Sequence, residues 1–248
     1  MWTGLENYRD LIHDDRVWTA IYNTFYYTAL AVPLGVVVAM VLAMAMNQKL
    51  PEVGIFRAIY YLPGVIPLFT LAFIFQILMN PTKGIFNRVF IWVGLPNINW
   101  FGDPRYAKLA LVILAQYGAG QAAIVFLAAL KGIPISLYEA AALDGANAWS
   151  RFRNVTLPLM TPVILYDIIL GLSLGLQIFT QVYILSGDPL GGPADSTLVY
   201  VLYLYQNAFT YGKLGYAAAM SWVLFAITFV LALVIFKTSK WWVNYEVI

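Results

Sequence analysis

The side chains that carry most enzyme chemistry are almost absent from this sequence. His13, in a charged N-terminal segment, is the only imidazole, and the 248 residues contain no cysteine. A Ser/His/Asp or Cys/His nucleophile set and a His/Cys metal site are therefore not expected. Asp167 is the only carboxylate inside a long apolar segment, so acid–base chemistry by paired carboxylates lacks its second member there. We predict that the chain is not an enzyme and that it binds no metal.

Phosphate-binding chemistry is missing as well. A loop of the Gly-x4-Gly-Lys-Ser/Thr type needs an earlier glycine and a hydroxyl after the lysine. Gly212 and Lys213 lack that earlier glycine and are followed by Leu214. The chain is therefore not expected to hydrolyse ATP. If ATP drives its function, a partner must bind the ATP and Mg²⁺, and this chain would bind no cofactor itself.

Asp167 taken alone indicates a different function. A carboxylate within an apolar segment is the expected handle for a proton or a sodium ion in carriers that use an ion gradient. Asp167 has no basic partner in any long apolar segment, and the sequence shows no evident inverted repeat. A secondary transporter that uses Asp167 is the alternative from another functional class.

Amide and aromatic side chains form a second group of candidates. One apolar segment contains Tyr117, Gly118 and Gln121, and another contains Gln177 and Gln181, which would share one helical face at i and i+4. Amides, hydroxyls and aromatic faces recognise polar solutes, so these residues are candidates for lining a polar path. Alternatively, the amides bond neighbouring helices, at about 0.6 kcal/mol each.

A polar stretch at 136–158 separates two apolar segments. Ser136 and Glu139 have the spacing of a capping box, which predicts a short helix over 137–144. Gly145 is expected to end this helix, because glycine adopts the left-handed C′ conformation without steric cost. A second helical piece is expected at about 149–154, and Pro158 suits the start of the next helix. Glu139 could cap its own helix, contact another protein, or do both.

The same stretch resembles the cytoplasmic coupling loop of ABC importer permeases. That signature is Glu-Ala-Ala, three residues, Gly, nine residues, an aliphatic residue, one residue and Leu-Pro. With Val155 at the aliphatic position, the residues in register are Glu139, Ala140, Ala141, Gly145, Leu157 and Pro158. In that family the loop inserts a helix into a cleft of the ATPase subunit. The resemblance implies a coupling role for these residues, in a coupling loop at 131–158 within a single transmembrane domain at 1–248.

Composition places the chain in a membrane. Apolar residues make up 62% and charged residues 10%, against about 25% charged in soluble domains. A membrane helix needs about 20 apolar residues, and unpaired backbone groups in lipid require helices for runs of this length. We expect an all-α integral membrane protein, by resemblance of the type I ABC importer fold, with five visible spans at 20–46, 58–79, 109–130, 159–185 and 214–236.

Several details of these segments carry further expectations. Permeases of this family usually have one more N-terminal span, and the segment at 4–11 resembles the one that follows it, so we expect a sixth span to be missing from this sequence. Interior prolines and glycines predict kinks and close helix contacts. Apolar patches at 85–95 and 198–209 are too short to span and are predicted to be interfacial or re-entrant helices, or docking surfaces for a binding protein.

The rest of the chain is similar to carbohydrate-uptake permeases of the maltose and glycerol-phosphate type. The similar stretches are 60–63, 79–87, 191–193, 202–209 and 215–217. Relative to the coupling loop, Tyr117, Gly118 and Gln121 lie where the maltose-type permease contacts its sugar, although most residue types there differ. The resemblance implies uptake of a sugar or a related polar solute.

The resemblance also implies an assembly. We expect a second related permease, two ATPase subunits and an extracytoplasmic solute-binding protein, in the cytoplasmic (inner) membrane of a bacterium or archaeon. A net charge of +2 with scattered basic residues gives no reason to expect nucleic acid as a partner.

Overall fold

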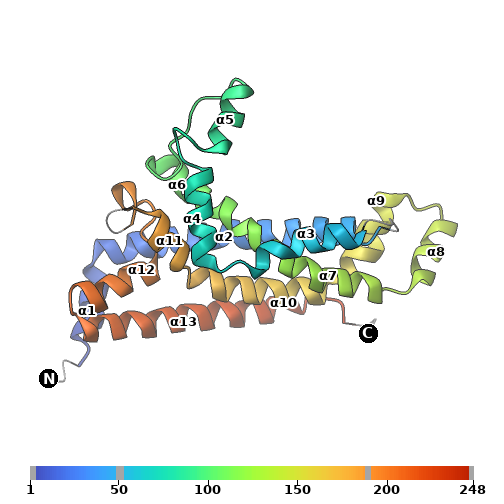
Figure 1. Cartoon of the computed structure of the whole chain (residues 1–248). Coiled ribbons are helices and arrows are strands. Elements are labelled where there is room, and N and C mark those ends of the chain that lie inside the picture. The colour runs from blue at the N-terminus through green and yellow to red at the C-terminus, as the bar shows by residue number, and fades with distance from the viewer. Residues whose placement is uncertain (1–3, 49–52, 188–190, 246–248) are drawn as a thin grey trace. The chain divides into compact units, whose positions relative to one another are not determined.

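A computed structural model describes residues 4–48, 53–187 and 191–245, and these residues form helices and loops without strands. The longest helix has 32 residues and the next 26 (Figure 1). The helices are α1 (Glu6–His13), α2 (Asp15–Met46), α3 (Val53–Val65), α4 (Leu68–Leu78), α5 (Ile85–Trp92), α6 (Pro104–Ala115), α7 (Ala119–Gly132), α8 (Ile135–Leu143), α9 (Ala148–Arg151), α10 (Leu157–Leu176), α11 (Thr180–Leu185), α12 (Tyr200–Tyr205) and α13 (Leu214–Ser239).

Long apolar helical stretches confirm the predicted fold class. Within the described residues, four are long and apolar enough to cross a membrane: Asp15–Met46, Pro104–Gly132, Ala148–Leu176 and Leu214–Ser239. The third of these begins in the loop predicted at 131–158 and continues into α10. Within Pro104–Gly132, a single 3₁₀ turn at Gln116–Gly118 separates α6 from α7.

The span predicted at 58–79 is not one continuous helix. It is divided into α3, which ends at Val65, and α4, which begins at Leu68. Pro67 precedes α4 with an extended ψ of 139°. A proline has no N–H to continue the preceding helix, and it biases the residue before it away from helical geometry. The expected kink is therefore a complete break, and neither helix reaches the roughly 20 residues of a span.

The span predicted at 159–185 is also shorter than expected. α10 ends at Leu176, and α11 begins only at Thr180. Phe179 breaks the helical path, with φ −143° and ψ −62°. Gln177, Thr180 and Gln181 make the sequence around this break polar, although it lies inside the segment predicted as one span.

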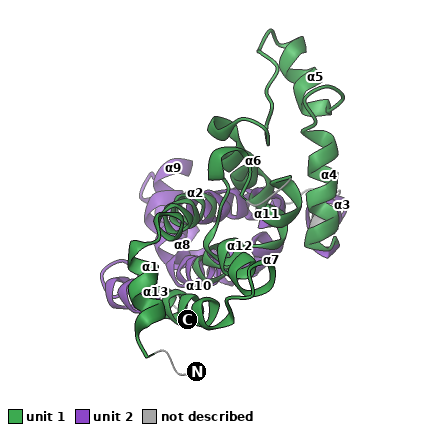
Figure 2. Ribbon diagram, turned by 90° about the vertical axis from the view of Figure 1, so that its left-hand side faces the viewer, with its two compact units in different colours: residues 1–31, 66–115, 172–230 green, residues 32–65, 116–171, 231–248 purple. Residues whose placement is uncertain are grey.

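Contacts divide the chain into two compact units, shown in green and purple in Figure 2. The first contains 1–31, 66–115 and 172–230, and its core surrounds Tyr200, which is 1% exposed and donates its hydroxyl to the Met220 carbonyl at 3.0 Å. The second contains 32–65, 116–171 and 231–248, and Phe126 and Met160 are fully buried in its core. Each unit therefore has a hydrophobic core of its own.

A glycine allows two helices of the second unit to approach closely. A Cβ atom on Gly120 of α7 would collide with the Tyr60 carbonyl oxygen of α3, whereas one on Gly118 would meet open space. The small-residue cluster at 118–120 thus serves a helix–helix contact at Gly120, as the sequence indicated.

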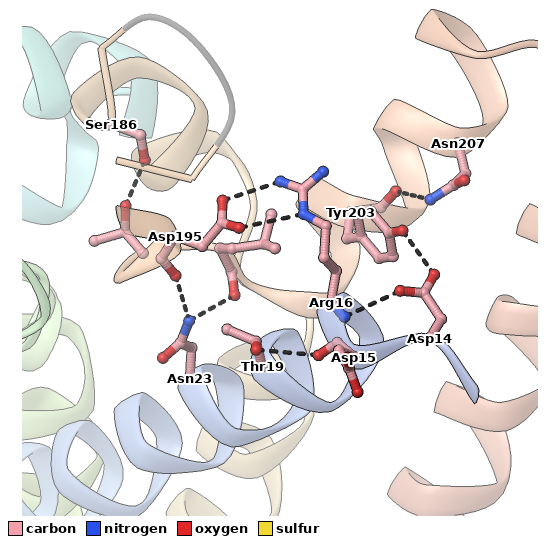
Figure 3. A network of polar contacts seen from close by, with 11 residues as sticks. Asp14, Asp15, Arg16, Thr19, Asn23, Ser186, Asp195, Tyr203 and Asn207 are labelled. Carbon is pink, nitrogen blue, oxygen red and sulfur yellow. Dashed lines mark hydrogen bonds and ion pairs between the residues drawn. The ribbon is translucent and has the colours of Figure 1, made fainter. Parts of the chain in front are cut away.

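A polar network in the first unit fixes the loop that precedes α12 (Figure 3). Arg16 donates two hydrogen bonds to the Asp195 carboxylate, at 3.2 and 2.9 Å, and Asn23 Nδ2 donates to the Asp195 carbonyl at 2.8 Å. Ala194 and Asp195 have φ of 52° and 54°, a conformation that costs non-glycine residues roughly 1–2 kcal/mol each. The bonds from α2 hold this unfavourable backbone in place.

Asp14 ties the N-terminal segment to α12 and α13. Its carboxylate accepts from the hydroxyls of Tyr203 and Tyr216, each at 2.7 Å. Burial raises the pKa of Asp14, but these bonds and two backbone amides outweigh burial and hold the pKa below its usual value. Burial and the bond to Asp14 raise the pKa of Tyr203 to about 12. The carboxylate is therefore charged, and both phenols are donors, at neutral pH.

Candidate coupling loop and translocation path

The coupling loop begins with a sharp turn after α7. Ile133 is extended, with φ −69° and ψ 122°, and Pro134 is the N-cap of α8. Helix α8 therefore begins at Ile135, two residues earlier than predicted. The predicted capping box is wrong: Ser136 lies inside the helix, and no side chain caps the N-terminus of α8. The reason is Pro134, which forces the residue before it to be extended and so fixes the turn one step upstream.

Gly145 ends α8 as predicted. Its φ is 77°, and its N–H donates to the Ala142 carbonyl at 3.1 Å. The Ala146 N–H donates to the Ala141 carbonyl at 2.9 Å. These two bonds form a Schellman motif, which pairs carbonyls at the helix end and requires the left-handed conformation at C′.

The second helical piece is present, and it has a cap that the sequence analysis missed. The Asn147 side chain accepts from the Ser150 N–H at 2.8 Å and so begins α9. An asparagine two residues after a helix-ending glycine is a recognisable N-cap signal. The outer surface between α8 and α9 is hollowed to about 450 Å³, with Asp144 and Asn154 among its polar lining.

Pro158 is the second residue of α10, as predicted, but the helical path does not begin there. The chain is helical from Ala148 to Leu176, with a π-helical turn at Phe152–Thr156 just before the proline. Because Pro158 has no N–H, it cannot donate to the carbonyl four residues back. The Leu157 N–H donates instead to the Phe152 carbonyl, five residues back. The wider turn carries the helical path past the proline, so that α9 and α10 belong to one continuous helical stretch.

A side-chain contact connects the coupling loop to α10, while most of the loop's surface is exposed. The Tyr138 and Thr156 hydroxyls lie 3.0 Å apart and connect α8 to the base of α10. No residue of α8 is buried; Leu143 is 90% exposed, and Trp149 of α9 is 67% exposed. Glu139 is exposed and has no hydrogen-bond or ion-pair partner in the described part of the chain. The loop thus presents apolar side chains and an unpaired carboxylate to the outside.

The first group of predicted path residues lies in the second unit. Tyr117 and Gly118 are exposed in the 3₁₀ turn between α6 and α7. Gln121 donates from Nε2 to the Gly64 carbonyl at 2.7 Å. Gly64 lies at the end of α3, where the helix break leaves carbonyls without their helical partners. Gln121 therefore bonds a neighbouring helix, which is one of the two roles that the sequence left open for it.

The second group belongs to the first unit. Gln177 is exposed just after α10, and Gln181 is half-buried in α11. The two glutamines do not share a helical face, because the break at Phe179 lies between them. That part of the prediction is wrong.

Comparison with known proteins decides the family. The family described as the inner membrane component of binding-protein-dependent transport systems matches residues 15–240. The chain belongs to this family. The permease is 37% identical over 247 residues to the probable ABC transporter permease protein YesP of Bacillus subtilis (strain 168), with 99% of this chain and 80% of the relative covered. It is 34% identical over 243 residues to the lactose transport system permease protein LacF of Rhizobium radiobacter, at 96% and 81% coverage.

Solved structures agree on the fold. A bacterial ABC transporter involved in the import of the acidic polysaccharide alginate contains a chain that superposes with a TM-score of 0.87, at 24% identity, over 96% of the permease and 84% of that chain. The permease is therefore an all-α, multi-pass inner membrane subunit of an ABC transporter. Its family is one of transport permeases rather than enzymes, and this membership does not favour the ion-gradient alternative with Asp167.

Proposed function

We propose that this permease forms half of the translocation pathway of an ATP-driven, binding-protein-dependent importer for a sugar or a related polar solute. Relatives over nearly the whole chain are named for lactose, for trehalose and maltose, and for arabinooligosaccharides. A matching structure holds an alginate transporter with its pentasaccharide-bound periplasmic protein. These names support a carbohydrate as the transported class.

The exposed coupling loop is the observation that carries the proposal. Helix α8 has no buried residue, and the large apolar side chains of Leu143 and Trp149 are exposed. Large apolar side chains exposed on a loop between two long helical stretches are suited to a contact with another protein. We assign this surface to an ATPase subunit, with Glu139, Ala140, Ala141, Gly145, Leu157 and Pro158 as the coupling residues. The π-turn at Phe152–Thr156 joins this contact to α10, so movement of the ATPase would reach the membrane-spanning region.

The energy source follows from the chain's own composition. No phosphate-binding loop is present in the sequence, so ATP and Mg²⁺ would bind on the ATPase subunits and no cofactor on the permease. The proposed assembly contains a second, related permease, two ATPase subunits and an extracytoplasmic solute-binding protein. Residues 1–248 would act in it as a single transmembrane domain.

Polar residues at two irregular points of the chain are the proposed path. Tyr117, Gly118 and Gln121 lie at the 3₁₀ turn of the second unit, and Gln177 and Gln181 lie around the helix break of the first. Unwound backbone within membrane proteins is tolerated where it lines a water-filled cavity or is buried in protein. These two places are therefore suited to a polar solute.

Reconstitution tests the function directly. The complete transporter, in proteoliposomes with ATP inside and its binding protein outside, should take up at least one of maltose, trehalose, lactose and an arabinooligosaccharide. Uptake should require ATP, the binding protein and the coupling loop together. Uptake of none of these sugars, with uptake of an amino acid or an inorganic ion instead, would overturn the carbohydrate assignment.

A further inference from the structure

Four aromatic rings gather where α10 gives way to α11 and where α12 ends. Tyr205 is central: its ring centroid lies 5.1 Å from Phe179, 5.7 Å from Tyr183 and 5.0 Å from Phe209. Phe179 and Tyr183 are themselves 5.4 Å apart. All four residues belong to the first compact unit. We call these four residues the aromatic platform.

The aromatic platform is open on its outer side. Tyr183 is 54% exposed and Phe209 is 72% exposed, while Phe179 and Tyr205 are half-buried beneath them. Neither the Tyr183 nor the Tyr205 hydroxyl has a hydrogen-bond partner among the residues that the structure describes. Phenol hydroxyls without partners are costly in hydrocarbon. The platform therefore suits a surface that needs both apolar contact and hydrogen bonding.

Both chain segments that form the platform leave α-helical geometry there. Residues 177–179 form the break between α10 and α11, and a π-helical turn at Gln206–Thr210 follows Tyr205 directly. At membrane depth, irregular backbone is confined to protein interiors and water-filled cavities, and π-turns occur often at functional sites. Within a bilayer, two such irregularities at one exposed ring cluster would favour contact with water or protein over contact with lipid.

A buried amide follows Tyr205 directly in the sequence. Gln206 is 1% exposed, and neither its Nε2 nor its Oε1 has a partner in the described part of the chain. A buried amide in this state needs a water molecule or a polar ligand to supply its hydrogen bonds. Gln177, on the other segment, is exposed at the break itself. Each of the two chain segments thus carries an amide close in sequence to a platform residue.

We propose that the aromatic platform is a binding site for an uncharged sugar ring on the translocation path. Exposed aromatic faces would stack on the C–H face of the sugar, and the Tyr183 and Tyr205 hydroxyls would bond its hydroxyls. None of the four side chains carries a charge, which suits a neutral carbohydrate. This proposal rests on the proposed function, because it names the recognition site for the sugar that the permease would carry.

The absence of native cysteine allows a direct test. A Thr210→Cys variant places the thiol on the exposed residue directly after Phe209 and keeps all four rings. It is assembled with all its partner subunits in proteoliposomes and treated with a membrane-impermeant methanethiosulfonate reagent, and modification is read on this chain alone. The matched control is Phe229→Cys, because Phe229 is also in the first unit, 52% exposed, and stacked on Phe225 at 6.0 Å, but lies within the long span of α13. The probes are maltose, trehalose and lactose.

Modification of the Thr210→Cys variant should be fast, and the sugar that the wild type transports should slow it about tenfold, whereas the sugars it does not transport should leave the rate unchanged. The Phe229→Cys variant should not react. If the Thr210→Cys variant also fails to react, lipid or the second permease covers the platform. If the Thr210→Cys variant reacts without protection by sugar, the platform is accessible to water but is not a sugar site. Either result overturns the proposal.

Two substitutions at Phe209 separate recognition from folding. Phe209→Trp keeps an aromatic face and should keep uptake, whereas Phe209→Leu keeps apolar bulk and should lower uptake about tenfold with the assembly intact, since an aromatic contact contributes roughly 0.5–1.5 kcal/mol beyond its area. Equal uptake by both variants would also overturn the site. If the wild type transports none of the probe sugars, the proposed function itself is contradicted. If the wild type transports a sugar but that sugar does not slow the modification, only the assignment of the aromatic platform as a sugar site is contradicted.

Discussion

Gly145 determines how α8 ends, and so where the coupling surface points. Its φ of 77° is one that side chains with a Cβ adopt at a cost of roughly 1–2 kcal/mol, and a β-branched residue is disfavoured further. A Cβ here would meet no neighbouring atom, so the effect of a substitution is conformational rather than steric. The Schellman bonds at Ala141 and Ala142 depend on this one conformation.

The Gly145→Val variant should therefore uncouple transport without unfolding the protein. We expect sugar uptake and the stimulation of ATPase activity by loaded binding protein to fall together, while the amount of permease in the membrane stays at the wild-type level. Gly145→Asn, which tolerates the left-handed conformation better, should retain more of both activities. Wild-type uptake by the valine variant would remove Gly145 from the coupling mechanism.

Glu139 has no part in capping its own helix. Helix α8 begins after Pro134, and the Glu139 carboxylate is exposed without a partner in the described residues. A Glu139→Gln variant should keep the wild-type thermal stability in detergent, since it loses no internal bond. Co-purification of the ATPase subunit, or ATP-driven uptake, should fall if the carboxylate meets a basic residue there. Unchanged co-purification and uptake would show that its charge is not used.

For single residues, the sequence predicts the conformation of the helix-ending glycine better than it predicts which residue caps the start of a helix. The left-handed conformation of Gly145 follows from its position after an alanine run and is intrinsic to the residue. The capping box at Ser136 and Glu139 has the right spacing, but Pro134 competes for the same turn and prevails. Whether Pro134 or Ser136 determines the start of α8 depends on the direction in which the chain leaves α7. A local sequence pattern does not contain that information.

Among the elements, the contact of α3 with α7 shows how breaks are compensated. Helix α3 stops before Pro67, and Gln121 of α7 bonds the Gly64 carbonyl near its end. Gly120 brings the two helices close enough for that bond, because its missing side chain makes room for the Tyr60 carbonyl. Close backbone approach at small residues is a common way to pack helices in membranes.

Gly120→Ala should consequently destabilise the permease, whereas Gly118→Ala should not. The added methyl at 120 would collide with backbone rather than with a flexible side chain, and over-packing of this kind costs typically 1–3 kcal/mol. At 118 the same methyl meets nothing within 4 Å. Thermal denaturation of the two variants in one detergent measures the difference. Equal midpoints would mean that α3 and α7 do not approach as closely as the structure shows.

The hydrophobic pattern predicts where the long helical stretches lie but not where helices break. Runs at 20–46, 109–130 and 214–236 are apolar, long and uncharged, and each lies within a long helical stretch. The breaks at Pro67 and Phe179 escape such an analysis for different reasons. Pro67 carries a local signal, which predicted a kink rather than a break. The break at Phe179 contains neither proline nor glycine and is accompanied only by polar residues at 177, 180 and 181, while the Phe179 ring packs against Tyr205.

For the whole molecule, the question is what drives the transport cycle. Family membership makes this chain a permease of an ABC transporter, and its exposed loop is the part that we propose contacts an ATPase. Asp167 lies half-buried in α10 without a hydrogen-bond or ion-pair partner in the part of the chain that the structure describes. A proton- or sodium-coupled carrier with this single acid in its spans would depend on it, whereas an ATP-driven permease has no need for a titrating group there.

The two mechanisms separate in energised vesicles. Wild-type permease, supplied with ATP and treated with an ionophore that collapses the ion gradient, should keep its sugar uptake. Asp167→Asn preserves the size of the side chain and removes its charge, and it should retain most of that uptake under the same conditions. The opposite result has two parts: wild-type uptake stops when the gradient is collapsed, and the Asp167→Asn variant is inactive even when the gradient is present. That result would mean that an ion gradient acting on Asp167 drives transport, and it would contradict the coupling role of the loop. Retained uptake in both leaves the ATPase contact at α8 as the route by which energy enters this chain.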